Sequence, residues 1–540
     1  MMVRTSSASS YATRLALAGA LGCAVVALSC AGDATSTSAP PIALGGGRGA
    51  PPAGAAAPDD EGFGERFQPT VELRPCAEAP EFECGTLLVP VDFDAPGGET
   101  FALSVTRARA TGERIGSLFV NVGGPSGFQT DTLRFLAGQR LASLRERFDL
   151  VTFDPRGTPS STPEARCQFE PPPPPAPGDP AARAAYLDEH ARRFADACLA
   201  QTGPAVTKIG TNHVARDIDL LRAALGEKTL SYLGFSYGAE LGAVYASLFP
   251  KRVRAMVLDG GTSDTFADYT VEAYAEQAAA TELALSRVDQ LCQADPGCPL
   301  HETGLAAGLG QVLAALRANP VPSEDGTFVL DEGAAARGVY VLLIGERNRW
   351  RLLPGFVAAA LAGEYDAWFD FAFPSDVGSD PYLQAYSAIL CNDFGSRRPA
   401  ADFLPALEAI ESLYPVGRFV EFDVLLSTCQ AWPAADPPTF RNVAAKMKTP
   451  ILFIGNEFDP ATPLNWTRHL ARALGMEASV LRYEGGGHTV SFSRQPVPCI
   501  DDLASRYLFD LETPPAGASC PALPITFLPP PAPSVEPAGG

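Results

Sequence analysis

The chain has 540 residues, of which 46% are apolar, so it can bury a core large enough for one or more globular domains. Its formal net charge is −21, because 62 acidic side chains outnumber 41 basic ones. A surface of that charge repels nucleic acid and anionic lipid, so we expect no nucleic-acid partner, and it favours ligands that carry an amine.

Residues 1–30 have the pattern of an export signal. Arg4 and Arg14 are the only charges before the apolar segment "LALAGALGCAVVALSC". This segment is too short and too rich in Ala and Gly for a membrane-spanning helix. It ends in "ALSC", which resembles a bacterial lipobox and would make Cys30 the acylated residue. We therefore expect a secreted or cell-envelope protein, with a membrane tether through a lipidated Cys30 as an open alternative.

Pro, Gly, Ala and Ser dominate residues 31–66, and little in this segment could pack into a core. Such a composition predicts a flexible, disordered tether rather than a domain. Behind a lipid anchor, it would hold a soluble domain away from the membrane.

Ten of the 12 cysteines remain once Cys23 and Cys30 in the signal segment are set aside. An even number in an exported chain predicts disulfides, although the sequence leaves their connectivity open. Zinc binding is disfavoured because the chain has no C-x-x-C pair. We expect no metal site and no other cofactor. The ten cysteines fall into five successive couples: Cys76 and Cys84, Cys167 and Cys198, Cys292 and Cys298, Cys391 and Cys429, and Cys499 and Cys520.

Strand and helix patterns alternate from residue 67 to residue 261, which predicts a mostly parallel sheet flanked by helices. Residues 116–127 read as a strand that runs into a glycine loop, and residues 212–225 have apolar side chains at helical spacing. The other expected elements are strands at 101–110, 148–157, 229–236 and 253–260, and a helix at 237–249.

Regular alternation stops near Gly261, and most of residues 262–440 is helix-like. Strand patterns resume at 449–459 and 478–488, with a helix pattern between them. We therefore predict an α/β core in two parts, 67–261 and 441–540, interrupted by a helical cap over 262–440.

Ser236 lies in a G-x-S-x-G motif between a predicted strand and a predicted helix, within "TLSYLGFSYGAELGAVYASLF". The motif alone is a weak signal in a chain with 50 glycines. The strand-to-helix context, however, is that of the nucleophile elbow of α/β-hydrolases. A serine hydroxyl becomes a nucleophile when a histidine takes its proton and a carboxylate orients that histidine. Ser236 is the predicted nucleophile.

His488 and Asp459 are the predicted partners, because both follow strands and the chain order serine, acid, histidine is that of the α/β-hydrolase fold. His488 comes after the flexible loop "EGGG", whereas His190 and His469 lie in charged helical stretches typical of solvated faces. Asp259, at the end of an earlier strand, is the alternative acid, since some hydrolases of this fold place the acid there.

The oxyanion of an acyl-transfer reaction needs two backbone N–H groups fixed in advance. Tyr237 follows the nucleophile at a helix N-terminus and would supply one. Gly124, in the loop "VGGPSG", would supply the other. In the next loop, "DPRG", we expect Asp154 and Arg156 to form an ion pair that clamps neighbouring loops.

The segments "GGPSG", "DPRGTPSS", "GFSYGAELG", "NEFDPATP" and "GGGHTV" together resemble the tripeptidyl aminopeptidases and proline iminopeptidase relatives of the α/β-hydrolase superfamily. The resemblance extends from "CAEAPEFECG" to "CPALP", the whole mature chain. It implies a serine exopeptidase that releases short peptides, tripeptides in the namesake enzymes, from free N-termini of oligopeptides. It also implies the same triad of Ser236, Asp459 and His488.

A free α-amine needs a carboxylate at the end of its subsite. Asp393, in the "CNDF" segment of the cap, and Glu240, just after the elbow, are the candidates.

Two other functions stay open at this point. An esterase or lipase could use the same machinery, because a fold does not determine a substrate. A non-catalytic binding module of this fold is disfavoured by the presence of all three triad residues. The oligomeric state is not predicted.

Overall fold

The computed structural model describes residues 62–529 except 126, 177, 263–268, 346, 372–379, 395–396, 420–428, 434–442, 444–446 and 448. The described residues all belong to one compact unit, Gly46–Gly540. The expected export signal, Cys30 and most of the expected tether lie outside the described residues. In the part of the chain that is described, no helix combines the length and apolarity needed to cross a bilayer.

The end of the expected tether is part of the core. Residues Phe63–Arg66 form the short helix α2, and Phe63 is 4% exposed. The Gly64 backbone N–H donates a hydrogen bond to Asp219 in a helix of the core (2.9 Å). The prediction of a tether over 31–66 therefore extends too far, because a single aromatic residue in a Gly-rich segment is enough to dock it.

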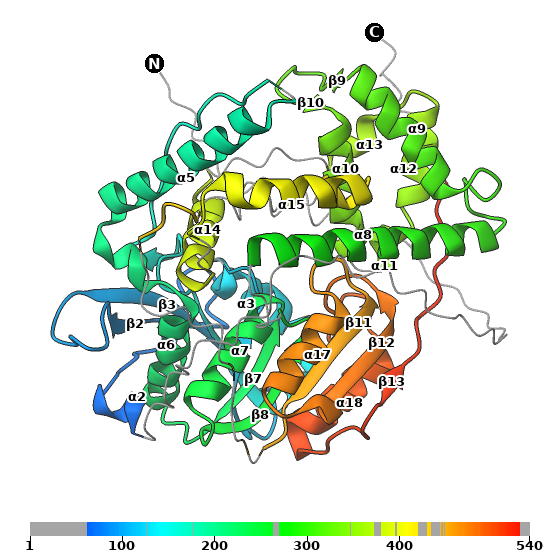
Figure 1. Cartoon of the computed structure of the whole chain (residues 1–540). Coiled ribbons are helices and arrows are strands. Elements are labelled where there is room, and N and C mark those ends of the chain that lie inside the picture. Colours follow the sequence, from blue (N-terminus) through cyan, green and yellow to red (C-terminus); the bar gives the residue numbers. More distant parts are fainter. Residues whose placement is uncertain are drawn as a thin grey trace, which may run out of the picture. The chain divides into compact units, whose positions relative to one another are not determined.

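One sheet organises the described residues (Figure 1). Its order is β1-β2-β3-β5-β4-β7-β8-β11-β12-β13, with β6 paired to β3. All pairs from β5 to β13 are parallel, while β1, β2, β3 and β6 pair in antiparallel fashion. This is the mostly parallel sheet that the sequence predicts. The strands are β1 (Arg74–Pro75), β2 (Glu83–Pro90), β3 (Thr100–Ala108), β4 (Gly116–Asn121), β5 (Phe148–Phe153), β6 (Ser161–Thr162), β7 (Leu230–Phe235), β8 (Val253–Asp259), β11 (Leu452–Phe458), β12 (Val480–Gly486) and β13 (Ser519–Cys520).

Helices cover both faces of the sheet, and each face has its own apolar core. One core takes side chains from α6, α7 and α17, and the other from α3, α4 and α18. Both β5 and β7 are buried along their whole length, as expected for central parallel strands. The flanking elements are α3 (Gln129–Ala137), α4 (Ala142–Arg145), η1 (Pro204–Lys208), α6 (Thr211–Ala224), α7 (Tyr237–Leu248), α17 (Leu464–Ala473), η4 (Glu477–Ser479) and α18 (Pro498–Asp510).

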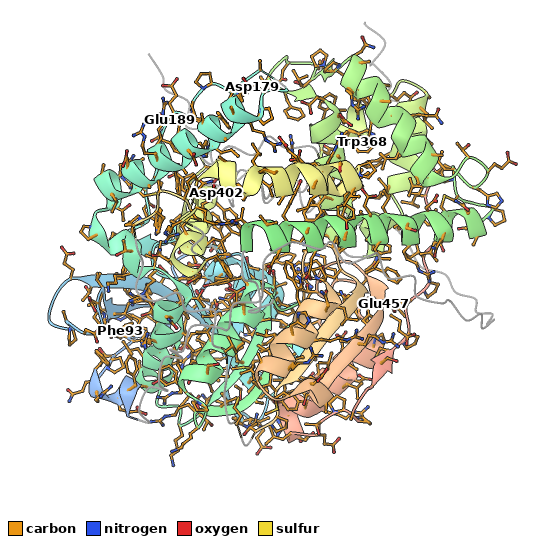
Figure 2. All side chains as sticks on the ribbon, viewed as in Figure 1. Phe93, Asp179, Glu189, Trp368, Asp402 and Glu457 are labelled. Atoms are coloured by element: carbon orange, nitrogen blue, oxygen red, sulfur yellow. A yellow bond between two sulfur atoms is a disulfide. The ribbon has the colours of Figure 1, made fainter. Side chains whose placement is uncertain are left out.

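A helical insertion separates β8 from β11 and has a core of its own. Its longest helix, α8, lies across the carboxyl ends of the strands (Figure 1). Trp368 is fully buried within this insertion, and its indole N–H donates to the Phe356 carbonyl (3.2 Å; Figure 2). The elements are α8 (Tyr269–Ala294), α9 (Leu305–Ala318), β9 (Val321–Pro322), β10 (Val329–Leu330), α10 (Glu332–Ile344), α11 (Arg347–Trp350), α12 (Leu353–Leu361), α13 (Asp366–Phe369), α14 (Pro381–Asp393), α15 (Ala400–Leu413) and η2 (Gly417–Phe419).

Helix α5 (Pro180–Thr202) belongs in sequence to the first half of the core but packs against the insertion. Its Arg183 forms a salt bridge with Glu411 of α15 (2.6 Å). Its Asp188 accepts a hydrogen bond from the backbone N–H of Ala400, the first residue of α15 (2.8 Å). The helical layer above the sheet thus comes from two chain segments, whereas the sequence predicts one.

Each of the five cysteine couples is joined in a disulfide, and two of these disulfides are local. Cys76 and Cys84 are eight residues apart, and their bond links the end of β1 to its antiparallel neighbour β2. Cys292 and Cys298 are six residues apart, and their bond closes the turn that follows α8 in the insertion. Both disulfides therefore fix a turn rather than join distant parts of the fold.

The other three disulfides tie larger structural parts together. Cys167–Cys198 fixes α5, Cys391–Cys429 fixes the end of α14, and Cys499–Cys520 joins α18 to β13. In all five cases each cysteine is bonded to its neighbour in sequence, as the couples suggest. Such a set of disulfides is the one expected for an oxidising compartment.

The "DPRG" loop is held differently from the sequence prediction, since Asp154 and Arg156 do not pair with each other. Arg156 forms a bidentate, fully buried ion pair with Asp217 of α6 (2.6 and 2.7 Å). Its guanidinium also donates to three backbone carbonyls, those of Pro90, Val91 and Lys208. Asp154 instead accepts hydrogen bonds at the start of α3. The prediction of an Asp154–Arg156 ion pair is therefore wrong.

Candidate active site

Ser236 occupies the turn between β7 and α7, and its backbone is strained. Its φ of 56° and ψ of −123° lie where non-glycine residues are rare. The Ser236 backbone N–H donates to the Asp259 carbonyl at the end of the neighbouring strand β8 (2.8 Å). A strained turn that lifts a serine above the carboxyl edge of a parallel sheet is the geometry of a nucleophile elbow.

The two glycines of the motif are required by close backbone approach. A Cβ atom on Gly238 would lie 2.5 Å from the Asn121 carbonyl oxygen of β4. A Cβ on Gly234 would lie 2.3 Å from the Gly238 carbonyl oxygen. Both distances are too short for a real side chain, so the spacing of glycines around Ser236 follows from the packing of β4, β7 and α7.

Asp459 and His488 are in contact at the ends of β11 and β12. The His488 Nδ1 atom lies 3.0 Å from Asp459 Oδ2 and 3.2 Å from Oδ1. Asp459 is buried, and its Oδ1 also accepts the backbone N–H groups of Ala461 and Thr462 (2.9 and 3.0 Å). A carboxylate held this way fixes the imidazole with Nδ1–H toward Asp459 and leaves Nε2 as the basic nitrogen.

Two opposing effects act on the pKa of His488. Burial lowers it, but the charge of Asp459 and the hydrogen bond to that carboxylate raise it, and the net result is a raised pKa. A smaller contribution in the same direction comes from the charge of Asp259. The imidazolium that forms when the histidine takes a proton is thereby stabilised.

Asp259, the alternative acid, holds the loop that follows His488. Its Oδ2 accepts the backbone N–H groups of Val490 and Ser491 (2.9 and 2.7 Å) and the Ser491 hydroxyl (2.6 Å). The His488 backbone N–H donates to the Ile344 carbonyl at the end of α10 in the insertion (2.9 Å). The histidine is thus positioned both by the core and by the insertion, and Asp459 is the acid that contacts its ring.

Thr462 is a site residue that sequence reasoning missed. Its hydroxyl donates to Asp459 Oδ2 (2.9 Å) and lies 3.2 Å from His488 Nδ1. The Thr462 hydroxyl thus adds a hydrogen bond to the Asp459 carboxylate and limits the movement of the His488 ring on that side. The turn "DPATP" offered a weak signal, since an aspartate in a turn often accepts hydrogen bonds from the residues that follow it.

The glycine loop after β4 packs directly on the elbow. A Cβ on Gly123 would lie 2.9 Å from the Ser236 Cβ. Gln129 holds this loop from both sides, because its side chain accepts from the Val122 N–H (2.9 Å) and donates to the Gly123 carbonyl (2.8 Å). Gln129 is a second residue that the sequence did not reveal, and nothing in its local pattern marks it.

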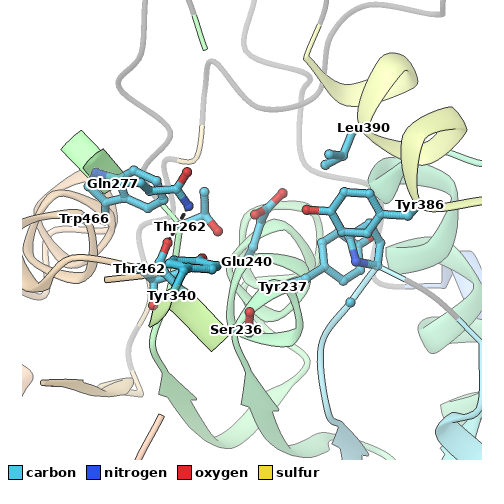
Figure 3. A pocket seen from close by; sticks show the side chains of 13 residues that line it. Ser236, Tyr237, Glu240, Thr262, Gln277, Tyr340, Tyr386, Leu390, Thr462 and Trp466 are labelled. Carbon is cyan, nitrogen blue, oxygen red and sulfur yellow. Dashed lines mark hydrogen bonds between the residues drawn. The ribbon is translucent and has the colours of Figure 1, made fainter. Parts of the chain in front are cut away.

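A pocket of about 130 Å³ lies over the elbow, between the sheet and the insertion (Figure 3). Ser236 and both predicted oxyanion-hole residues, Gly124 and Tyr237, line it. Thr462 lines it as well, beside the Asp459–His488 pair. The insertion contributes Gln277 from α8, Tyr340 from α10, and Tyr386 and Leu390 from α14.

The two candidate acids for amine binding differ in position. Glu240, one helical turn after Ser236, lines the pocket and is 2% exposed, and its carboxylate points into the space beside Tyr386 (Figure 3). Asp393 is not among the lining residues, and both its oxygens accept hydrogen bonds from Thr211 (2.7 and 2.6 Å). The geometry therefore does not support Asp393 as an amine ligand, because the first turn of α6 occupies its carboxylate.

Comparison with known proteins gives a consistent set of relatives. A family model described as "TAP-like protein" matches residues 417–520, which hold Asp459 and His488. Serine protease Hip1 of Mycobacterium tuberculosis is 32% identical over 490 residues, covering 83% of this chain and 91% of that protein. Carboxylesterase B of the same species is 30% identical over 81% of this chain and 86% of its own length. Tripeptidyl aminopeptidase of Streptomyces lividans is 29% identical over 81% and 83%.

Proposed function

The chain belongs to the TAP-like family of α/β-hydrolases, and on that premise we propose that it is an exported serine exopeptidase that releases short peptides from free N-termini. The observation that carries this proposal is the contact of His488 with Asp459 beside the pocket that Ser236 lines. Five disulfides support an extracytoplasmic location. Tripeptides are the proposed unit of release, as in the tripeptidyl aminopeptidase relative.

The proposed reaction proceeds through an acyl-enzyme. Ser236 Oγ attacks the scissile carbonyl carbon while His488 Nε2 takes the hydroxyl proton, and the oxyanion accepts the backbone N–H groups of Gly124 and Tyr237. The tetrahedral intermediate then collapses. The C–N bond breaks, and the leaving amine, which is the new N-terminus of the remaining substrate, takes the proton from His488. The N-terminal fragment stays bound to Ser236 as an ester. Water, deprotonated by the same histidine, hydrolyses that ester.

A second candidate function is carboxylic ester hydrolysis, which the similarity to carboxylesterase B favours. Products from a mixed oligopeptide library, measured by mass spectrometry, separate the two functions. The exopeptidase proposal expects fragments lost from free N-termini and none from N-acetylated peptides. Turnover of acyl esters without any peptide product would favour the esterase.

The pH dependence of kcat/KM tests the role of His488. Only the neutral imidazole can take a proton, and the Asp459 charge raises the pKa of His488 above its ordinary value of about 6.5. Activity should therefore fall as the pH is lowered through a midpoint above that value. The residual activity of Asp459→Asn should have its pH midpoint at a lower value than the wild type. The reason is that burial still lowers the pKa of His488, while the Asp459 charge that raises it is gone. An unchanged midpoint would contradict the pairing of His488 with Asp459.

Glu240 is the proposed ligand of the substrate amine, because its buried carboxylate lies in the pocket one helical turn from the nucleophile. Glu240→Gln should weaken binding of peptides with free N-termini roughly 10- to 100-fold, the cost of a charge-assisted hydrogen bond. The KM values of acyl esters should stay unchanged. Kinetics on paired free and ester substrates measure the difference.

Glu276→Gln is the matched control for that variant. Glu276 also lies near the pocket, but its Oε2 accepts from the Trp466 indole N–H (2.6 Å) and from the Asn465 amide. Removing this charge should affect both substrate classes alike. Suppose that Glu276→Gln weakened binding of free N-termini as strongly as Glu240→Gln does. The effect would then come from the negative charge of the region in general, and not from a direct contact between Glu240 and the substrate amine.

A further inference from the structure

Three buried side chains connect the helical insertion to the residue that follows the nucleophile. Asp393 is the last residue of α14, Thr211 the first of α6 and Tyr237 the first of α7. The Thr211 backbone N–H donates to Asp393 Oδ1 (2.7 Å) and its hydroxyl to Oδ2 (2.6 Å). The Thr211 hydroxyl oxygen lies 2.6 Å from the Tyr237 hydroxyl. The insertion and the elbow are thus joined by consecutive short hydrogen bonds.

This chain of groups is shielded from water. Asp393, Thr211 and Tyr237 are 1%, 0% and 4% exposed. A Cβ on Gly210 would lie 2.8 Å from Asp393 Oδ1, so the carboxylate fits tightly against the backbone at the start of α6. Burial raises the pKa of Asp393 to about 7, although the hydrogen bonds from Thr211 act in the opposite direction.

The carboxylate sets the direction of the hydrogen bonds. Above a pH of about 7 Asp393 is ionised and can only accept, so the Thr211 hydroxyl must then donate to it. The Thr211 oxygen then accepts a hydrogen bond from the Tyr237 hydroxyl. Tyr237 is therefore anchored by an oriented partner, and neither hydroxyl is free to rotate.

The anchor acts where the backbone is under strain. The peptide group between Ser236 and Tyr237 carries the N–H that faces the developing oxyanion in the proposed reaction. This peptide group comes directly after the strained dihedral angles of Ser236. Its N–H lies in the first turn of α7, where N–H groups have no intrahelical acceptor. Rotation of the peptide group would relieve the strain at Ser236 and turn the Tyr237 N–H away from the substrate oxygen. A tyrosine ring fixed at its far end opposes that rotation.

We propose that Asp393, acting through Thr211, is a positioning residue for the oxyanion hole and holds the Tyr237 backbone N–H toward the substrate carbonyl. This inference rests on the proposed roles of Ser236 and Tyr237 in catalysis. It gives the insertion a part in the chemical step, in addition to closing the pocket. Asp393 does not touch the substrate.

The test uses Thr211→Val, which keeps the shape of the side chain and removes its hydroxyl. With a small acyl ester as substrate, kcat should fall about 10- to 100-fold at unchanged KM, as expected when a transition-state donor is displaced. Thr211→Ser keeps the hydroxyl and should restore most of the rate. Affinity for a boronic acid, which forms a tetrahedral adduct on the serine, should fall in parallel with kcat in Thr211→Val.

A further variant resolves the case in which Thr211→Val fails to fold, and a double variant applies where both single variants fold. Tyr237→Phe removes the other end of the same contact and should give a similar loss of kcat. The double variant should lose no more than either single variant, because both break one connection.

Tyr245→Phe is the matched control on the same helix. The Tyr245 hydroxyl is buried and donates to Asp219 (3.0 Å), but it lies two turns away from the elbow. This variant should lose stability without losing kcat. The proposal is overturned if folded Thr211→Val or Tyr237→Phe keeps the wild-type kcat, or if Tyr245→Phe loses as much. A fully active Ser236→Ala would instead overturn the proposed function.

Discussion

Ser236→Ala should lower kcat for peptides and esters by about four to six orders of magnitude, to a residual rate that reflects binding and the oxyanion hole alone. The expectation follows from the strained elbow that presents Ser236 to the pocket, next to the contact between Asp459 and His488. Loss of the hydroxyl removes the nucleophile while the other two residues stay in place. Steady-state kinetics on one peptide and one ester measure the effect.

The same variant should fold and bind substrate. The Ser236 side chain does not cap α7, and the hydrogen bond from its backbone N–H to the Asp259 carbonyl does not depend on the side chain. The melting temperature should therefore stay close to that of the wild type. Ser231→Ala, a change on the same strand outside the pocket, is the control for activity. Undiminished hydrolysis by Ser236→Ala would refute the nucleophile assignment.

Asp217→Ala should destabilise the protein by about 3–5 kcal/mol, the largest stability effect that we expect from one side chain. The variant leaves the Arg156 guanidinium buried without its counter-ion, next to the rings of Phe93 and Phe101 (5.2 and 5.0 Å; Phe93 is labelled in Figure 2). The three carbonyls bonded to Arg156 keep the charge from moving to solvent. Urea unfolding followed by circular dichroism measures the loss.

Glu411→Ala provides the contrast. It breaks the salt bridge to Arg183, in which both side chains are about one-quarter exposed. Exposed pairs contribute roughly 0–1 kcal/mol, so this loss should be several times smaller. Equal effects of the two substitutions would show that burial of the Arg156–Asp217 pair is not what makes it important.

Most strands of the sheet were predictable because their patterns are local, although β2 (Glu83–Pro90) was not among the predicted strands. Alternation of strand and helix patterns placed β7, α7 and β8 to within one or two residues of their observed bounds. The cysteine couples were predictable for the same reason, since each cysteine pairs with its neighbour in sequence. The position of Asp459 at the end of β11 and of His488 just after β12 followed from strand ends alone.

Burial of isolated polar residues was less predictable. His190 lies among charged residues and was expected on a solvated face, yet it is buried against Phe169 (5.0 Å between ring centroids). Phe169 lies outside any helix, ahead of α5 in the chain, and covers a face of α5 that would otherwise meet water. Composition within one helix does not reveal which other segment covers it.

The sequence by itself determined the fold class, the chain order of the proposed nucleophile, acid and histidine, and the cysteine couples. It could do so because periodicity, glycine spacing and parallel topology bring the ends of successive strands to one edge of a sheet. Only the tertiary structure decided which buried polar groups meet. The partners of Arg156, Asp393 and Gly123 are Asp217, Thr211 and Gln129, and each choice depends on how helices dock on the sheet. A local pattern carries no information about such docking, because the free energy that selects it is spread over the whole core.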